Sequence, residues 1–301
     1  MTYFRLLPAL VVVALGLASQ ARAELFKDAF PDLFSQINDE YQSDVGKLEL
    51  QHGTIVLNGG VAQVAVPDGY YFLGPKDAQY VSEKLWHNPK SMTLLGMVFP
   101  ANMTPFEPES WAITYEYDPI GYVSDADAEG YNYTELLETM QVDQRENNKE
   151  RVKDGFPAIE LLGWAAEPHY DKVQRKLHWA QRLSFSDSEG ETLNYNIRVL
   201  GRKGILLVNF IAGMEQLAEV QAAVPEALEM VSFTDGNKYS DFVPSMDTVA
   251  AVGIGGLIAG KVAAKAGLLI LLLAFLKKGF ILVLLPLFWL KNKVFGKRGD
   301  S

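Results

Sequence analysis

Short runs of alternating apolar and polar positions fill the middle of the chain, between two long apolar stretches at its ends. Around the turn Leu57-Asn58-Gly59-Gly60 this alternation predicts a β-hairpin over 53–66, because Asn-Gly adopts the positive φ angles that tight hairpins need. The same period of two predicts further strands at 70–73, 92–99, 111–117, 158–164, 177–185, 192–200, 204–212 and 231–233. Spacing near 3.6 residues predicts helices at 76–86, 134–151 and 216–230.

Tandem strands with only a few helices indicate an α+β fold with mostly antiparallel sheets and packed helices. We expect this domain to occupy 24–246, with a candidate seam between two subdomains in the polar stretch 118–130. The order of hairpins, long helix and last short strand is also similar to the α/β/α sandwich of PsbP and Mog1. A likeness of fold transfers no function.

The N-terminus has the pattern of a signal peptide, 1–23. Arg5 precedes a short apolar run, and Ala21-Arg22-Ala23 offers small residues for cleavage after Ala23. The alternative is an N-terminal membrane helix, but the apolar run is too short to span a bilayer comfortably.

The C-terminal apolar region, 247–290, predicts a membrane anchor, followed by a basic tail at 291–301. Its apolar run is interrupted by Lys261, Lys265, Lys277 and Lys278. Because a lysine at mid-bilayer costs about 2.5–3.5 kcal/mol on insertion scales, one crossing within 249–290 plus an interfacial portion fits best. We therefore expect a protein of the bacterial inner membrane, with its domain in the periplasm and its tail in the cytoplasm.

Charge and cysteine content agree with this placement. Residues 24–246 carry 17 Lys and Arg against 35 Asp and Glu, a net charge of −18. Such an acidic domain is a poor partner for nucleic acid. The chain has no cysteine, so an exported domain must be stabilised by packing alone, and lipid attachment through cysteine is excluded.

Small residues recur every three or four positions at the start of the anchor region. Gly253, Gly256, Gly260, Ala263 and Gly267 would share one helix face, where backbones can approach closely. This predicts self-association or a membrane-protein partner. The alternative is a glycine-rich helix end of low helical propensity.

The sequence Asp125-Ala-Asp127-Ala-Glu129-Gly130 matches the first half of a calcium-binding loop. Asp125, Asp127 and Glu129 are therefore candidate calcium ligands. The bidentate Glu expected at the twelfth position is replaced by Leu136, so the alternative is a short capped turn.

Two other groups of polar residues are candidates for a functional site. His169 and Asp171, with Asp125 and Asp127, would suit a hydrolase or metal-dependent enzyme if they met in one cleft, whereas a turn between strands is the simpler interpretation. On the strand at 192–200, Asn194, Asn196 and Arg198 share one face, which could bind a carboxylate or phosphate. A solvated sheet face is the simpler interpretation there.

Several stretches carry a family resemblance: Val66-Pro67-Asp68-Gly69-Tyr70, Gly121-Tyr122-Val123-Ser124-Asp125, Gly163-Trp164, Leu193-Asn194-Tyr195-Asn196 and Gly201-Arg202-Lys203-Gly204. With shorter matches they cover nearly all of 25–275 and resemble domain-of-unknown-function family 2167, bacterial membrane-anchored proteins. The resemblance implies a signal peptide, an exposed domain and an anchor, and it brings no catalytic residues. We therefore expect a non-enzymatic binding or interaction role, with the Asp/His enzyme as the alternative.

Overall fold

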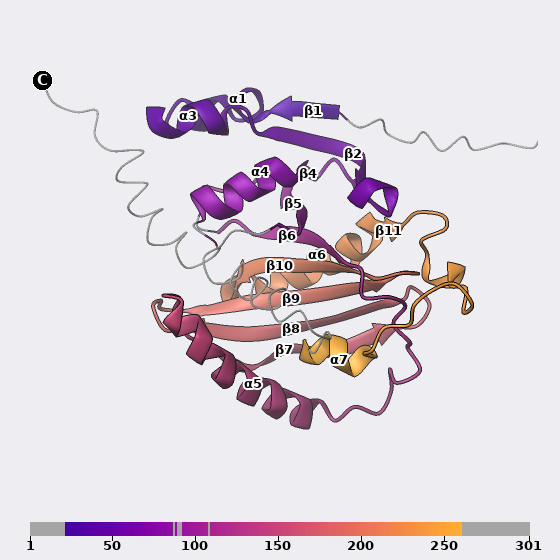
Figure 1. The fold of residues 1–301 in the computed structure, drawn as a ribbon. Helices are drawn as coiled ribbons and strands as arrows, with labels where there is room; N and C mark the ends of the chain where they lie inside the picture. Colours follow the sequence, from indigo (N-terminus) through magenta and orange to yellow (C-terminus); the bar gives the residue numbers. More distant parts are fainter. Residues whose placement is uncertain (1–21, 87, 89–91, 108, 261–301) are drawn as a thin grey trace, which may run out of the picture.

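One twisted antiparallel sheet organises the chain (Figure 1). The computed structural model describes residues 22–86, 88, 92–107 and 109–260. Ten strands follow the order β11-β3-β2-β4-β5-β6-β10-β9-β8-β7, and β1 pairs with β2 outside this path. The strands are β1 (Arg22–Leu25), β2 (Glu49–Leu57), β3 (Ala62–Val66), β4 (Tyr70–Leu73), β5 (Leu94–Pro100), β6 (Ala112–Asp118), β7 (Ile159–Asp171), β8 (Lys176–Phe185), β9 (Glu191–Leu200), β10 (Ile205–Gly213) and β11 (Val231–Phe233).

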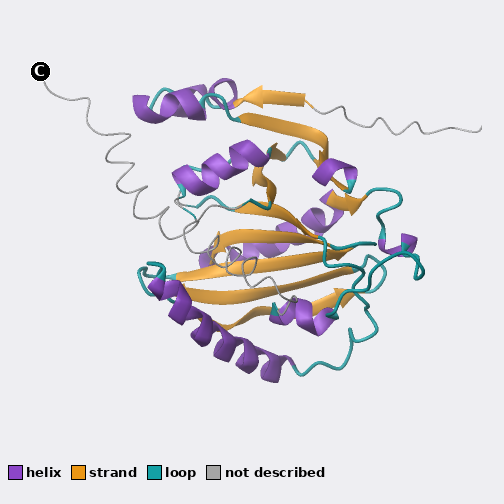
Figure 2. Ribbon diagram, viewed as in Figure 1, coloured by secondary structure: helices purple, strands orange, loops and turns teal. Residues whose placement is uncertain are grey.

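Helices cover both faces of the sheet (Figure 2). They are α1 (Phe26–Ala29), α2 (Pro31–Phe34), α3 (Asp39–Val45), α4 (Pro75–Tyr80) with a π-type turn at Val81–Leu85, α5 (Tyr133–Lys153), α6 (Leu217–Met230) and α7 (Ile254–Ala259). Helices α5 and α7 lie on one side of β7–β10, and α6 lies behind them (Figure 1). The longest helix, α5, begins where the side chain of Asn132 accepts hydrogen bonds from the amides of Thr134 and Glu135.

The structure confirms an α+β fold dominated by an antiparallel sheet. The hairpin expected at 53–66 is β2–β3, with a turn at Asn58–Gly60 in which Asn58 and both glycines have positive φ. Strand β7 is longer than expected: it runs on to Asp171, so His169, Tyr170 and Asp171 end a strand, and the turn follows them.

The sheet is continuous through the stretch 118–130. Strand β6 ends at Asp118 and pairs with β5 on one side and β10 on the other, so the strands on the two sides of the candidate seam belong to one sheet. The folded part also passes the expected limit at 246, because Ile254, Leu257 and Ile258 of α7 are buried against the domain.

Both chain ends reach beyond the described residues. Of the expected signal peptide only Arg22 and Ala23 are described, in strand β1, opposite His52 and Gln51. The rest of the expected anchor, 261–290, and the tail, 291–301, lie outside the described residues, as does Gly267. Within the described part, no helix is both long enough and apolar enough to cross a bilayer.

Helix α5 covers one edge of the sheet. The Asn148 side chain binds the backbone of Ile159 twice, accepting from its N–H at 3.0 Å and donating to its carbonyl at 2.8 Å. Gln141 donates to the carbonyl of Leu161 at 2.9 Å. An unpaired strand edge can pair with another chain, and here the side-chain amides of Asn148 and Gln141 bind the backbone of the edge strand β7.

Candidate functional site

A row of polar side chains is buried on the sheet face below α5 and α7. Asn194, Asn196 and Arg198 of β9 are only 1%, 2% and 4% exposed. Their common face was predicted correctly, since Tyr195 and Ile197 point to the opposite side, toward α6. The interpretation as a solvated face is wrong, because two helices cover it.

The Arg198 guanidinium is fixed by neutral acceptors. It donates to the backbone carbonyl of Ile197 at 2.9 Å, to Asn209 Oδ1 at 2.9 Å and to Asn196 Oδ1 at 3.0 Å. It also lies over the ring of Trp179, 5.0 Å from its centre. Burial lowers the pKa of Arg198 to about 10, and the charges of Glu116 and Asp118 oppose that decrease.

Glu116 supplies negative charge on the same buried face. Its carboxylate accepts a hydrogen bond from Thr93 Oγ1 at 2.5 Å and is 3% exposed. Burial raises the pKa of Glu116, whereas the Thr93 hydroxyl and the Arg198 charge partly counteract the increase. The cation and the carboxylate thus compensate each other within the fold.

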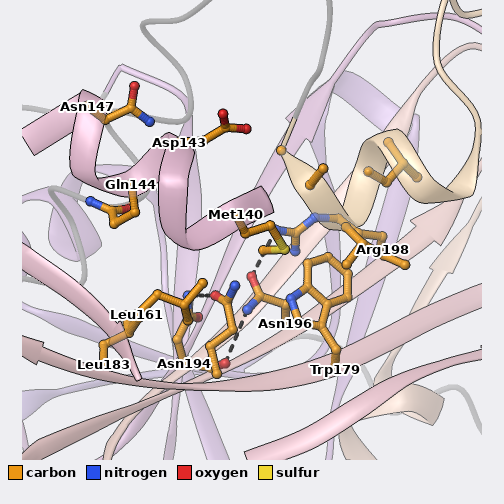
Figure 3. Close-up of a pocket in the computed structure, with 15 residues that line it drawn as sticks. Met140, Asp143, Gln144, Asn147, Leu161, Trp179, Leu183, Asn194, Asn196 and Arg198 are labelled. Atoms are coloured by element: carbon orange, nitrogen blue, oxygen red, sulfur yellow. Dashed lines mark hydrogen bonds between the residues drawn. The ribbon is translucent and has the colours of Figure 1, made fainter. Parts of the chain in front are cut away.

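A cavity of about 70 Å³ lies between this polar row, α5 and α7 (Figure 3). In Figure 3, Met140 of α5 points toward Arg198 and Trp179, with Asn194 and Asn196 on the strand below. The remaining lining residues are Asp143, Gln144, Asn147, Leu161, Gln181, Leu183, Leu257, Ile258, Ala259 and Gly260. This volume holds a few water molecules or one small polar group.

Two lining side chains have a buried polar atom without a hydrogen-bond partner in the described part of the chain. They are Trp179, through Nε1, and Asn194, through Oδ1. Asn209 Nδ2 is also unpartnered there, but Asn209 does not line the cavity. Leaving such a group unsatisfied costs about 1–3 kcal/mol, so two such residues beside one cavity make it a candidate binding site.

Helix α7 forms one wall of the cavity and is fastened by the loop that precedes α5. Asp127 Oδ1 accepts from the Ile254 amide at 3.0 Å, and the Tyr131 hydroxyl accepts from the Gly255 amide at 3.1 Å while donating to Asp127. A Cβ on Gly253 would overlap the Asp127 carboxylate, and one on Gly255 would overlap the Tyr131 ring. These glycines therefore permit close packing within the domain.

The three candidate calcium ligands point to three different sets of partners. Asp125 accepts from Tyr170 at 3.0 Å and Tyr239 at 3.1 Å, and it forms an ion pair with Arg175. Asp127 fastens α7, and burial, which would raise its pKa, is outweighed by hydrogen bonds from Tyr131 and backbone amides that lower it.

The third candidate, Glu129, forms an exposed ion pair with Lys172 at 2.6 Å. Among the described residues, no group of three or more His, Asp or Glu side chains is placed to hold a metal ion. Calcium binding by this loop stays a prediction.

The enzyme alternative requires His169 and Asp171 to meet Asp125 and Asp127. Asp171 instead accepts from the amides of Val173 and Gln174 in its own turn. The ring of His169 packs against that of His178, 5.2 Å between centres, and His178 bonds the Tyr195 hydroxyl at 2.8 Å. Each of these side chains is thus engaged at a different place.

Trp179, Gln181 and the wall formed by α7 were not predicted from the sequence. A signal for the first two existed: Trp179 and Gln181 alternate on β8 as Asn194 and Asn196 do on β9, and the register pairs Gln181 with Asn194. Polar residues on adjacent strands of one face indicate a shared polar site, but only the covering helices show that it is buried.

Comparison with known proteins identifies a family and finds solved structures of low similarity. The family described as "Protein of unknown function (DUF2167)" matches residues 49–288. No curated protein matches the sequence. The solved structure of PsbP (CyanoP) from Synechocystis sp. PCC 6803 matches with 11% identity and a TM-score of 0.35, covering 60% of this chain and 91% of its own.

The Ran-binding protein Mog1p of Saccharomyces cerevisiae matches with 12% identity and a TM-score of 0.32, covering 64% of this chain and 100% of its own. At these TM-scores neither likeness carries an argument about function.

Proposed function

Because this chain belongs to the DUF2167 family of proteins of unknown function, we propose its function from its own cavity. It is a non-enzymatic binding protein that holds a small polar molecule between α5, α7 and the sheet. The observation that carries this proposal is a cavity lined by buried polar side chains, two of which, Trp179 and Asn194, each have a polar atom with no hydrogen-bond partner in the described part of the chain.

Burial of a polar row in the middle of a sheet supports this proposal. An apolar face would have packed below α5 and α7 at lower cost, since each buried polar group must recover its lost hydration. Residues that pack less favourably in a core than apolar ones are expected at functional sites. Asn194, Asn196 and Arg198 are three such residues, buried on one strand.

The proposal also places the domain in the bacterial periplasm, attached to the inner membrane. The signal-like pattern of 1–23, the missing cysteines and the basic residues after the apolar region support this placement. Because 254–259 pack on the domain, we propose that the crossing falls within 261–290, and that Gly260 and Gly267 belong to the face that meets a second copy or a membrane protein.

The binding role is tested by thermal unfolding of the full chain in detergent. The probes are acetamide, acetate and glycerol, and the variant is the double substitution Trp179→Phe with Asn194→Leu. At least one probe should raise the melting temperature of the wild type, by about 2–4 °C for each kcal/mol of binding in a domain of this size. The double variant should not respond to that probe.

If none of the three probes stabilises the wild type, or if the double variant responds equally, the cavity does not bind small polar molecules and the proposal fails.

A further inference from the structure

Two histidines lie side by side on the sheet face opposite the cavity. His169 of β7 is the register partner of His178 of β8, and their ring centres are 5.2 Å apart with 65° between the ring planes. We propose that this pair binds a divalent transition-metal ion of the zinc and copper class. The inference is independent of the proposed cavity function, because His178 and the cavity residue Trp179 are neighbours on β8 and point to opposite faces.

The separation of the two rings suits two imidazoles on one ion. A zinc–nitrogen bond is about 2.0–2.1 Å, and at a tetrahedral angle the centres of two coordinated imidazoles then lie about 5 Å apart. Residues directly opposite each other on paired strands hold their Cβ atoms about 4.5–5.5 Å apart, so the backbone sets this spacing. Imidazole nitrogen is a ligand of zinc and copper, whereas magnesium and calcium take oxygen.

The ring of His178 is oriented by a partner, as the rings of metal-binding histidines are. Its Nδ1 lies 2.8 Å from the hydroxyl of Tyr195 on β9, and Tyr195 is buried. When Nε2 coordinates an ion, Nδ1 carries the proton and donates it to this hydroxyl, which fixes the tautomer and the direction of the ring. Tyr195 is therefore a positioning residue of the site.

His169 supplies the second nitrogen from the surface. Its side chain is exposed, and within the described part of the chain no hydrogen bond holds its ring. It can therefore turn about its side-chain bonds toward an ion on His178, which is half-buried. Water would complete the coordination, since among the described residues no third His, Asp or Glu is placed to join the pair.

The surrounding charges favour a bound cation over a proton. Burial lowers the pKa of His178, the charge of His169 lowers it further, and Asp171 opposes them, so the ring is neutral at neutral pH and able to coordinate. Lys176, the register partner of Asp171, donates through Nζ to the carbonyl of Leu228 in α6. The net charge of −18 over 24–246 attracts cations to the domain.

The test is titration calorimetry of the full chain in detergent, purified without a histidine tag, with zinc as the probe. The wild type should bind one zinc ion per chain that excess magnesium does not displace. Loss of an orienting partner alone costs about 10- to 100-fold in metal affinity, so His169→Gln and His178→Gln should each weaken binding by more than about 10-fold. His52→Gln is the matched control, because His52 lies on β2, far across the sheet from β7, and bonds the Tyr70 carbonyl.

Electron paramagnetic resonance of bound copper identifies the ligands directly. The wild type should show coupling to two imidazole nitrogens, and His169→Gln should show coupling to one. Tyr195→Phe should weaken zinc binding by about 10-fold while the copper spectrum still shows two nitrogens, because the hydroxyl orients a ligand and is not one itself.

Unchanged zinc affinity in His169→Gln would overturn the inference. Because His169 is exposed, this variant should fold even if His178→Gln does not. Zinc that excess magnesium displaces would also overturn it, since such zinc would be held by surface carboxylates. A copper spectrum without nitrogen coupling would show that the two rings only pack against each other.

Discussion

The carboxylate of Asp127 accepts a hydrogen bond from the amide of Ile254 at 3.0 Å, across 127 positions of sequence. This contact joins the loop before α5 to the first turn of α7, and α7 forms a wall of the cavity. One wall of the cavity is therefore a short helix whose first turn is held by the side chains of Asp127 and Tyr131.

Replacing Asp127 by Ala should loosen α7 without unfolding the sheet. Loss of a capping side chain costs about 0.5–2 kcal/mol. Hydrogen exchange of the amides at 254–259 should accelerate, whereas exchange in β9 and β10 should stay slow. Asp68→Ala is the control, because Asp68 is exposed and its one ion pair among the described residues, at 3.6 Å, is with Arg22, which is also exposed. Unchanged exchange in α7 would mean that burial of its apolar residues alone holds the helix.

Gly253→Ala should act through the same contact. The added Cβ would overlap the Asp127 carboxylate and displace it from the Ile254 amide. The free energies of unfolding of Gly253→Ala and Asp127→Ala should therefore not add in the double variant. Gly69→Ala is the control, since Gly69 has open space around its Cβ position. Additive losses would show that Gly253 serves another contact, such as the association face expected from the sequence.

Glu116→Gln should change how stability depends on pH. The pKa of Glu116 is raised in the fold above its ordinary 4.5, so the folded state binds its proton more tightly than the unfolded chain. Its contribution is therefore fully present below pH 4.5 and is lost as pH rises through the folded pKa.

Urea unfolding of the full chain in detergent, from about pH 4 to pH 8, should show the wild type losing stability relative to Glu116→Gln as pH rises. Glu138→Gln on the exposed face of α5 should run parallel to the wild type. A difference that is constant with pH would contradict the raised pKa.

Asn148→Ala should expose the edge of β7. Both backbone groups of Ile159 would lose their partner, and each lost bond is worth about 0.5–1.5 kcal/mol. We expect a lower urea midpoint, faster exchange at Ile159 and more aggregation on heating, because an open edge can pair with another chain. Glu138→Ala, an exposed change on the same helix, should show none of the three.

Calcium should leave the melting temperature unchanged. Asp125, Asp127 and Glu129 each have their own partner, and regrouping them around an ion would break the contact that fastens α7. The measurement is thermal unfolding with calcium and then with chelator. A higher melting temperature in calcium would show that the loop rearranges into the site expected from its sequence.

Local patterns predicted the elements better than they predicted the site. The turn at Asn58–Gly60, strand β4 and the closing helix α6 follow from short-range rules of conformation and spacing. Strand β7 extends past the expected end at 164 through irregular pairing with shifted register, and a strict alternation of apolar and polar residues does not predict such pairing.

Helix α7 was missed because glycines and apolar residues next to a membrane-like run give the same pattern whether they face lipid or a sheet. For the polar residues of β9, the alternation along the strand predicted their shared face correctly, whereas the interpretation of that face as solvent-exposed was wrong. Burial of Asn194 and Arg198 depends on α5 and α7, which are far away in sequence and reach that face only through the tertiary fold.

The position of α7 has a mechanical consequence. If the chain beyond Gly260 is fixed in a bilayer, any tension on that tether reaches α7 before it reaches a strand. Tension would separate Ile258 and Leu257, which line the cavity, from the domain while the strands remain hydrogen-bonded. The cavity would thus lose one wall before the sheet unfolds. Pulling single molecules from the C-terminus would reveal this as a small first extension, absent when a disulfide is engineered between α7 and its loop.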